Sequence, residues 1–482
     1  MISFPFALWK ASGPPPVPVT LYSNNSVSTN WNDVGNWWLD AGYTIPALRI
    51  PISGDTVYSN LASEDTVYPA VSLANFYGLG VTGAGNNGAL TVASSGNLQV
   101  TGGCWFGNCP DLLTAVFTSS AWNYATLGCY NIIEFRDVSQ NAGSINAYVT
   151  FYDSAINIGT CNMGAVFKAY SKNSGNIASG YADFYDYSEN TSSASTIDNA
   201  SFHDYSYNSG GVNNANLYDH AANAGGIYNV NFYGSSANTT GYIGYGEFYD
   251  YSQNTLGGVI YYATEFHSYS TNIGTAYDYV YFYDGASNYG VMNGNAVFFG
   301  SSYNAYVDGL CNFAAYFHDS SLNYGTVFGF STFTDSSTNT IYGHCVSDAS
   351  FDNASTNYGI VEGGSTFGST YGSTAVNGGT VNNSFSGINY FYHNCTNTGT
   401  AFYYTNFYDN SNNAGFAGWV AFYNNSENSF GGTCNLHAEF WNDTINYGAV
   451  NYDAFFYDNS NQFGGVNLLG GTTTCSTTGV CP

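Results

Sequence analysis

One repeating pattern of hydrophobic and polar positions dominates this chain. Alignment on a recurrent Phe, replaced once by Leu, gives 21 copies between Phe117 and Phe456, and successive anchors lie 15 to 19 residues apart except for one step of 24. A small residue stands four positions after the anchor, Asn stands six positions after it in 19 of the 21 copies, and Gly is common at eight. The unit can be written A-x-F-Y-D-x-S-x-N-x-G-x-V.

This period predicts an all-β fold. Alternation of inward and outward positions is typical of strands, a unit of about 16 residues is too short for two helices, and Gly, Asn and Ser disfavour helix. Two short strands joined by tight turns fit one coil of a solenoid. We therefore expect a single-stranded β-solenoid, a β-helix or β-roll, of about 21 coils with about 16–18 residues per coil. Coils stacked ~4.8 Å apart predict a rod of roughly 100 Å.

Each shared position has an expected role in a coil. The Phe rings should stack as a ladder inside a thin core, the small residue should leave room opposite the ring, and Gly should allow the positive φ of a tight turn. Each Asn should hydrogen-bond to neighbouring Asn residues or to turn backbone, because a buried amide needs partners. The predicted ladders include Phe151, Phe184, Phe248, Phe282, Phe317 and Phe407, and Asn123, Asn141, Asn157, Asn173, Asn190, Asn208, Asn254, Asn288, Asn323, Asn413 and Asn446.

The remaining segments predict end structures. Residues 1–20 contain GPPPVPV and are expected to be a Pro-rich arm or linker. Residues 21–112 are expected to form an N-terminal β cap or irregular first coils, since bare terminal coils would expose unpaired strand edges. Residues 113–466 are the repeat domain, with a loop or bulge expected around residues 371–390, and residues 467–482 are expected to be a short C-terminal cap.

A second aromatic row directly follows the anchor. If the anchor points inward, these tyrosines point outward, beside Asn and Ser. Such a stripe would contact sugars or a neighbouring copy; the alternative is that Tyr only covers the corner of each coil. The candidate contact stripe comprises Tyr152, Tyr185, Tyr233, Tyr249, Tyr283, Tyr392, Tyr408, Tyr423 and Tyr457.

Eleven copies carry Asp two positions after the anchor. These carboxylates are expected to accept hydrogen bonds from the amides of their own turn. The alternative is Ca²⁺ held between coils, for which the weak candidates are Asp137, Asp153, Asp186, Asp204 and Asp219. The row is interrupted and lacks the dense G-G-x-G-x-D calcium repeat, so turn capping is the favoured interpretation. No other cofactor is expected.

Ten cysteines are present. Cys104 with Cys109, and Cys475 with Cys481, form close pairs at segment ends, which indicates candidate disulfides in an oxidising compartment; free thiols are the equal alternative. The other cysteines are expected to be small buried hydrophobes of the repeat core.

Charge limits the partners. The chain has five Lys and Arg residues, none after Lys172, and a net charge of −27. Nucleic acid binding needs basic patches, and anionic membranes are disfavoured for the same reason. No apolar run is long enough for a transmembrane helix, and the first residues do not have the pattern of a secretory signal.

The repeat resembles those of β-solenoid proteins of bacteriophage fibres and bacterial surface adhesins. The resemblance rests on F-Y-D-x-S-x-N-x-G, as in FYDNSNNAG (407–415), covers about three quarters of the chain, and is supported by WNDVGNWW followed by GDTVY near the start. It implies an extracellular, cell-surface or virion location and a role in attachment or scaffolding. It supplies no catalytic residue.

We therefore expect a non-enzymatic structural or adhesive fibre protein. The alternative is a self-assembling subunit of an extracellular filament or coat. The expected partners are glycans or other copies of the chain, in a homo-oligomer. A polysaccharide-degrading spike is the third alternative, since some β-helical spikes cleave polysaccharide with paired carboxylates. No acidic cluster stands apart from the repeat, and no Ser nucleophile elbow or phosphate loop is present.

Overall fold

The computed structural model describes residues 17, 19–23, 33–51, 55–59, 75–79, 97–101, 109–118, 122–123, 126–178, 180–192, 196–305, 308–381, 387–463 and 473–475. The chain forms two compact units, residues 1–213 and residues 214–482. In the described parts of both, the regular structure is β-strand apart from one 3₁₀ turn, Val34–Asn36. No helix among these residues is long and apolar enough to cross a membrane.

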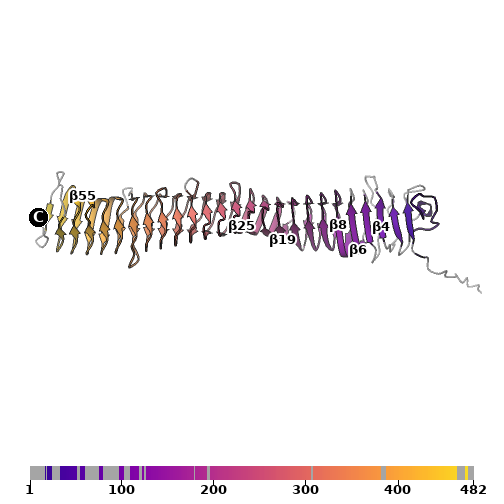
Figure 1. The fold of residues 1–482 in the computed structure, drawn as a ribbon, viewed down its shortest axis with the longest axis horizontal. Helices are drawn as coiled ribbons and strands as arrows, with labels where there is room; N and C mark the ends of the chain where they lie inside the picture. Colours follow the sequence, from indigo (N-terminus) through magenta and orange to yellow (C-terminus); the bar gives the residue numbers. More distant parts are fainter. Residues whose placement is uncertain are drawn as a thin grey trace, which may run out of the picture. The chain divides into compact units, whose positions relative to one another are not determined.

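The fold class is confirmed: both units are β-solenoids built from parallel strands (Figure 1). A typical coil of the second unit contains three short strands, β36 (Leu310–Cys311), β37 (Ala315–Phe317) and β38 (Leu322–Asn323). Each pairs in parallel, without register shift, with the equivalent strand of the next coil. The expectation of two strands per coil was wrong, because the chain bends between β36 and β37 and one predicted arm is thereby divided into two strands.

The strands of each unit fall into three rows, named by the residue they present. In the first unit, the anchor strands are β6 (Cys109–Thr118), β8 (Thr126–Phe135), β11 (Tyr148–Phe151), β14 (Gly164–Phe167), β17 (Tyr181–Phe184) and β19 (Thr196–Phe202). Its Asn strands are β7 (Trp122–Asn123), β9 (Gln140–Asn141), β12 (Ile156–Asn157), β15 (Lys172–Asn173), β18 (Glu189–Asn190) and β20 (Tyr207–Asn208). Its aliphatic strands are β10 (Ser144–Ile145), β13 (Thr160–Cys161) and β16 (Asn176–Ile177), and β21 (Gly211–Leu217) crosses the unit boundary in sequence.

The second unit has the same kinds of row, with more coils. Its anchor strands are β23 (Gly226–Phe232), β25 (Tyr242–Phe248), β28 (Thr264–Phe266), β31 (Val280–Phe282), β34 (Ala296–Phe298), β37, β40 (Ser331–Phe333), β43 (Ala349–Phe351), β46 (Ser365–Phe367), β49 (Asn389–Phe391), β51 (Thr400–Tyr408), β53 (Phe416–Tyr423), β55 (Thr433–Phe440), β58 (Asp453–Phe456) and β60 (Thr473–Cys475).

The other two rows of the second unit are made of two-residue strands. Its Asn strands are β22 (Ala222–Asn223), β24 (Ala237–Asn238), β26 (Gln253–Asn254), β29 (Thr271–Asn272), β32 (Ser287–Asn288), β35 (Tyr303–Asn304), β38, β41 (Thr338–Asn339), β44 (Thr356–Asn357), β47 (Val376–Asn377), β50 (Thr396–Asn397), β52 (Asn412–Asn413), β54 (Glu427–Asn428), β56 (Ile445–Asn446) and β59 (Asn461–Gln462). Its aliphatic strands are β27 (Val259–Ile260), β30 (Thr275–Ala276), β33 (Val291–Met292), β36, β39 (Thr326–Val327), β42 (His344–Cys345), β45 (Ile360–Val361), β48 (Thr380–Val381) and β57 (Ala449–Val450).

The segment before the repeat also stacks in parallel where it is described. Strands β1 (Thr20–Ser23), β3 (Thr56–Ser59), β4 (Asn75–Leu79) and β5 (Asn97–Thr101) pair one after another and lead into β6, while β2 (Trp37–Trp38) pairs antiparallel with β1. Arg49 binds the buried carboxylate of Asp55 with both terminal nitrogens, at 2.6 and 2.8 Å. The described strands β1, β3, β4 and β5 therefore pair in parallel, as those of the repeat do. The predicted Pro-rich arm and C-terminal cap lie almost entirely outside the described residues.

The Gly at the eighth position has a different role from the one expected. Gly159, Gly290 and Gly359 do not adopt the positive φ of a tight turn. A Cβ on Gly359 would lie 2.1 Å from the carbonyl oxygen of Gly343 in the preceding coil, and one on Gly290 would lie 2.1 Å from that of Gly274. The position requires Gly because two backbones approach too closely for any side chain.

The irregular stretch near Tyr371 is an insertion in one turn. Tyr371 is 92% exposed, and the chain then returns so that Asn377, not Ser373, takes the Asn position of this coil. Asn377 accepts a hydrogen bond from Asn357 at 2.8 Å and donates one to Asn397 at 2.7 Å. Fixed spacing from the anchor therefore misassigned this coil, because the four extra residues fall between anchor and Asn.

Candidate functional site

The predicted Phe anchors lie inside each unit as a continuous stack. In the second unit, 13 consecutive ring pairs from Phe232 to Phe456 have centroids 4.5–5.0 Å apart and nearly parallel planes. In the first unit the stack runs from Phe117 to Phe202 at 4.4–4.9 Å. These rings are fully buried. The strand spacing imposes the separation of the rings, so the row is a packing device without access to a ligand.

The predicted Asn residues form a second internal ladder. Each side-chain Nδ2 donates to the Oδ1 of the Asn in the next coil, over 2.7–3.0 Å from Asn123 to Asn208 and over 2.7–2.9 Å from Asn223 to Asn446. The same amide also bonds to turn backbone: the N–H of Gly325 donates to Asn323 Oδ1 at 3.2 Å. Both predicted partners are thus used together, which satisfies a group that would otherwise be costly to bury.

The tyrosines of the candidate contact stripe are half-buried, and most of them stack on an aromatic ring of a neighbouring coil. In the second unit, Tyr218, Tyr233 and Tyr249 follow each other at 5.1 Å, and Tyr392, Tyr408 and Tyr423 at 5.1 and 4.8 Å. His267 and Phe299 fill Tyr positions within the row. Because each ring covers its neighbour's face, the stripe presents ring edges and hydroxyls outward, so it is poorly arranged to stack on sugars by ring faces.

The outer row also changes the acidity of its phenols. Burial, followed by the charges of Tyr423 and Tyr392, raises the pKa of Tyr408 to about 12. Burial raises the pKa of Tyr283 and of Tyr392 as well. In the first unit, Lys168 takes a position in this row and its ammonium lies 5.6 Å from the ring centre of Tyr152 and 5.8 Å from that of Tyr185. The phenols of Tyr283, Tyr392 and Tyr408 are therefore neutral at physiological pH.

All eleven aspartates after the anchor adopt the left-handed conformation, with φ between 48° and 61°. Asp and Asn tolerate this region better than most residues. Where a backbone amide donates to one of these carboxylates, as from Gly300 N–H to Asp319 at 3.1 Å and from Asp137 N–H to Asp153 at 3.4 Å, the amide belongs to the preceding coil rather than to the same turn as predicted. Among the described residues, no three His, Cys, Asp or Glu side chains gather to hold a metal ion.

Five cysteines, Cys161, Cys311, Cys345, Cys395 and Cys434, are free and buried, as predicted for the core. Burial raises the pKa of Cys345 to about 12 and that of Cys395 to about 11. Cys475 is disulfide-bonded. Cys104 and Cys481 lie outside the described residues, as does the side chain of Cys109, so the two predicted pairings remain predictions.

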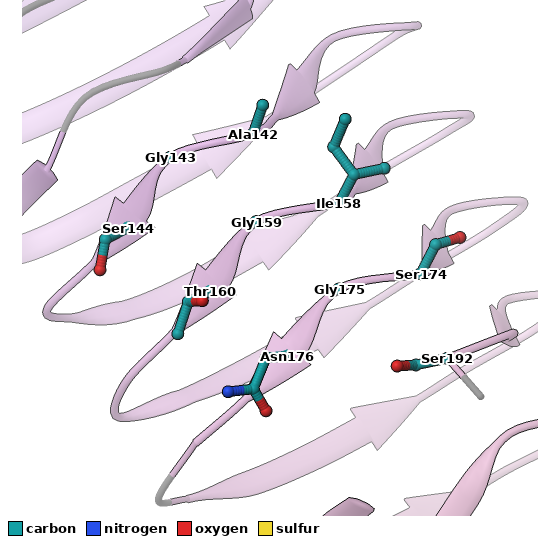
Figure 2. Close-up of a pocket in the computed structure, with 10 residues that line it drawn as sticks. All are labelled: Ala142, Gly143, Ser144, Ile158, Gly159, Thr160, Ser174, Gly175, Asn176 and Ser192. Atoms are coloured by element: carbon teal, nitrogen blue, oxygen red, sulfur yellow. The ribbon is translucent and has the colours of Figure 1, made fainter. Parts of the chain in front are cut away.

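The first unit has a shallow groove of about 590 Å³. Figure 2 shows that Gly143, Gly159 and Gly175 lie in line along it. Ser144, Thr160 and Asn176 border one side, and Ala142, Ile158 and Ser174 border the other. A Cβ on Gly159 would lie 2.0 Å from the carbonyl oxygen of Gly143. Close coil packing alone therefore accounts for this groove.

A pocket of about 310 Å³ in the second unit holds two carboxylates, Glu247 and Glu265, which pair directly across β25 and β28. Tyr249 donates to Glu247, and His267 Nε2 lies 3.1 Å from Glu265. Asn229, Tyr245 and Tyr281 complete the walls. Paired carboxylates in a pocket are the arrangement that polysaccharide hydrolysis uses.

A third cavity, about 210 Å³, is lined by Gly387, Tyr403, Tyr404 and Trp419. The sequence reasoning missed it. Its signal was present as aromatic residues outside the anchor phase, in AFYYTNFY (401–408) and GWVAFY (418–423).

Comparison of the chain with protein-family models, curated proteins and solved structures finds no match, so the geometry alone must indicate what these sites do.

Proposed function

We propose that this chain is a non-enzymatic structural and adhesive fibre protein, displayed on a virion or a cell surface, that contacts glycans or neighbouring copies through its Tyr- and Asn-rich outer face. The observation that carries the proposal is the outer row, in which the same hydroxyl-bearing ring recurs on successive coils. A ligand or partner with its own repeat could bind such a row at many points at once, and weak contacts then add up.

Outer Asn residues that precede the anchor in sequence add further polar groups to the exterior. Asn229 donates to Asn214 at 2.9 Å, and Asn451 donates to Asn435 at 3.2 Å, each one coil apart. Hydroxyls and amides at rung spacing form hydrogen bonds to sugar hydroxyls or to the same groups on a second copy. The interior also supports the proposal. Its Phe and Asn side chains are buried and contact only other parts of the chain, so a ligand or partner would have to bind the exterior.

The test removes hydroxyls without removing rings. A triple variant, Tyr392→Phe, Tyr408→Phe and Tyr423→Phe, keeps the stack and should retain the melting temperature. Binding on a glycan array, or concentration-dependent assembly in sedimentation velocity, should fall at least tenfold. The matched control changes three tyrosines outside the row, Tyr342→Phe, Tyr358→Phe and Tyr371→Phe, and should bind normally. Equal binding by parent and triple variant would contradict a role for the row.

Glycan binding and self-assembly are separated by the same pair of measurements. Binding on the array without assembly favours an adhesin, whereas filaments at rising protein concentration without glycan binding favour a subunit of an extracellular filament or coat. If the parent protein shows neither glycan binding nor self-assembly, the proposal as a whole is contradicted.

A polysaccharide-degrading spike is a second candidate because Glu247 and Glu265 line one pocket. Incubation with capsular or cell-wall polysaccharide, followed by measurement of reducing ends, tests it. Release by the parent and loss in Glu247→Gln and Glu265→Gln, with Glu362→Gln as a control outside the pocket, would replace the non-enzymatic proposal.

A further inference from the structure

The cavity beside Trp419 departs from the regular coil in its backbone as well as its side chains. The register shifts between Ala401 and Tyr404, and again between Ala417 and Trp419 in the next strand. Tyr403 has φ +60°. Among the described residues of the second unit, it is the only non-glycine residue with positive φ outside a turn that follows an anchor. A bulky residue in this region is strained, and such strain persists where the surroundings enforce it, often at binding sites.

Three aromatic side chains form the walls of this cavity. Tyr403, Tyr404 and Trp419 are 38%, 54% and 42% exposed. The rings of Tyr404 and Trp419 lie 5.3 Å apart at 67° to each other, so they meet as two walls near a right angle. Gly387 also lines the cavity. Unlike the outer Tyr row, whose rings cover one another, this corner leaves aromatic surface facing a space of about 210 Å³.

His437 supports Trp419 from the next coil. Its ring lies 5.3 Å from that of Trp419 at 27°, and its Nε2 is 3.0 Å from Glu439 Oε1. Glu439 Oε2 also accepts a hydrogen bond from Trp441 Nε1 at 3.1 Å. Trp419 is thus backed on one side, which holds its orientation toward the cavity and leaves less side-chain freedom to be lost on binding.

Charge selects among the ligands that an aromatic cavity of this size accepts. No Lys or Arg follows Lys172 in the sequence, so the whole second unit lacks both, while the chain carries a net charge of −27. Anionic groups are therefore repelled, and a cation is attracted. A primary ammonium is strongly hydrated, whereas methylated ammonium is bound by several aromatic faces at once.

We propose that Tyr403, Tyr404 and Trp419 bind a quaternary ammonium group, such as that of choline or of a trimethyl-lysine side chain. The cavity is smaller than a typical drug-sized pocket, which fits a trimethylammonium head and not an extended ligand. This site is independent of the proposed contacts through the outer Tyr row.

The test uses proton NMR of choline chloride titrated with the full-length protein. The methyl signal should move upfield and saturate, because aromatic ring faces shield bound protons, with a Kd of about 1 mM, as expected for a few cation–π contacts at a half-open site. Its neutral isostere, 3,3-dimethylbutan-1-ol, should bind at least tenfold more weakly. Trp419→Ala and Tyr404→Ala should each abolish the saturable shift, whereas Phe430→Ala, which removes a 93% exposed aromatic elsewhere, should keep it.

Unchanged melting temperatures in these variants show that the fold is intact. No saturable shift with the parent, an equal shift in Trp419→Ala, or equal binding of the neutral isostere would overturn the proposal. N-acetyl-trimethyl-lysine amide and phosphocholine then distinguish the source: tighter binding of the former indicates a protein ligand, tighter binding of the latter a head group, and either supports the ammonium site. Loss of this site leaves the array and sedimentation results of the outer-row variants unaffected.

Discussion

The inner and outer aromatic rows follow the same coils but differ in how strictly their residue type repeats. From Phe232 to Phe456 every anchor of the second unit is Phe, whereas one position later the row contains Tyr, His, Phe, Thr, Asp, Gly and Trp. The inner ring is enclosed by the rings of both neighbouring coils, while the outer ring keeps an edge in water. A position that is packed on all sides accepts few types of side chain, whereas a position that is open to water on one side accepts many.

The largest expected difference between the two rows comes from removing one ring from each. Phe317→Ala deletes a ring stacked at 4.7 Å on both sides and should destabilise the surrounding coils by about 3–5 kcal/mol. Tyr283→Ala, in the outer row, should cost about 1 kcal/mol. Thermal unfolding of full-length variants measures both, with the melting temperature as readout because long repeat arrays do not unfold in two states. Equal losses would contradict the distinction.

The Asn ladder should be nearly as sensitive as the Phe ladder. Asn323→Leu keeps the approximate volume but removes the partner of Asn304, Asn339 and the Gly325 amide. Unpaired buried groups cost about 1–3 kcal/mol each, so we expect a loss of about 2–4 kcal/mol after partial relaxation. Ser321→Ala is the matched control: its buried Oγ has no hydrogen-bond partner among the described residues. A change within about 0.5 kcal/mol is expected there.

Two glycines allow the same comparison of a closely packed and an open position to be made at the backbone. Gly359→Ala places a Cβ 2.1 Å from a carbonyl oxygen of the preceding coil and should cost about 1–3 kcal/mol through forced displacement. Gly226→Ala has nothing within 4 Å of the new Cβ and should be neutral or stabilising by up to about 1 kcal/mol. The melting temperatures of the two variants provide the comparison, and equal shifts would show that coil spacing does not set this position.

The smallest expected effect is a loss of stability at alkaline pH that comes from the outer row. Since the pKa of Tyr408 rises from 10.0 to about 12 in the fold, the folded state holds the proton more tightly. The resulting stabilisation is complete below pH 10 and is lost as the pH rises toward 12. Buried Cys345 and Cys395, whose raised pKa values start from 9.0, contribute a similar fall. The difference in melting temperature between the parent and Tyr408→Phe across pH 9–12 therefore isolates the outer row; identical pH profiles would contradict it.

The repeated features of the fold could be predicted from the sequence, whereas the features that occur once could not. Phe and Asn at fixed phase were enough to predict stacked parallel coils, because every copy reports the same environment. The role of Gly359 was predicted wrongly. Turn preferences describe only residues that are close in sequence, whereas the carbonyl oxygen that excludes a side chain at Gly359 belongs to another coil. The cavity at Trp419 was missed because it depends on two register shifts and one strained residue, Tyr403, which have no periodic signature.

Hydrogen–deuterium exchange of the native full-length protein tests the central claim most directly. If stacked rungs enclose the Phe and Asn rows, amides of the anchor and Asn strands should exchange slowly in every coil, while those of the Asp turns and of the insertion around Tyr371 exchange faster. Peptides covering residues 126–178 and 214–305 should show the same alternation at the repeat period. Fast exchange throughout these ranges, or protection without that period, would contradict the stacked solenoid and its enclosed rows of Phe and Asn.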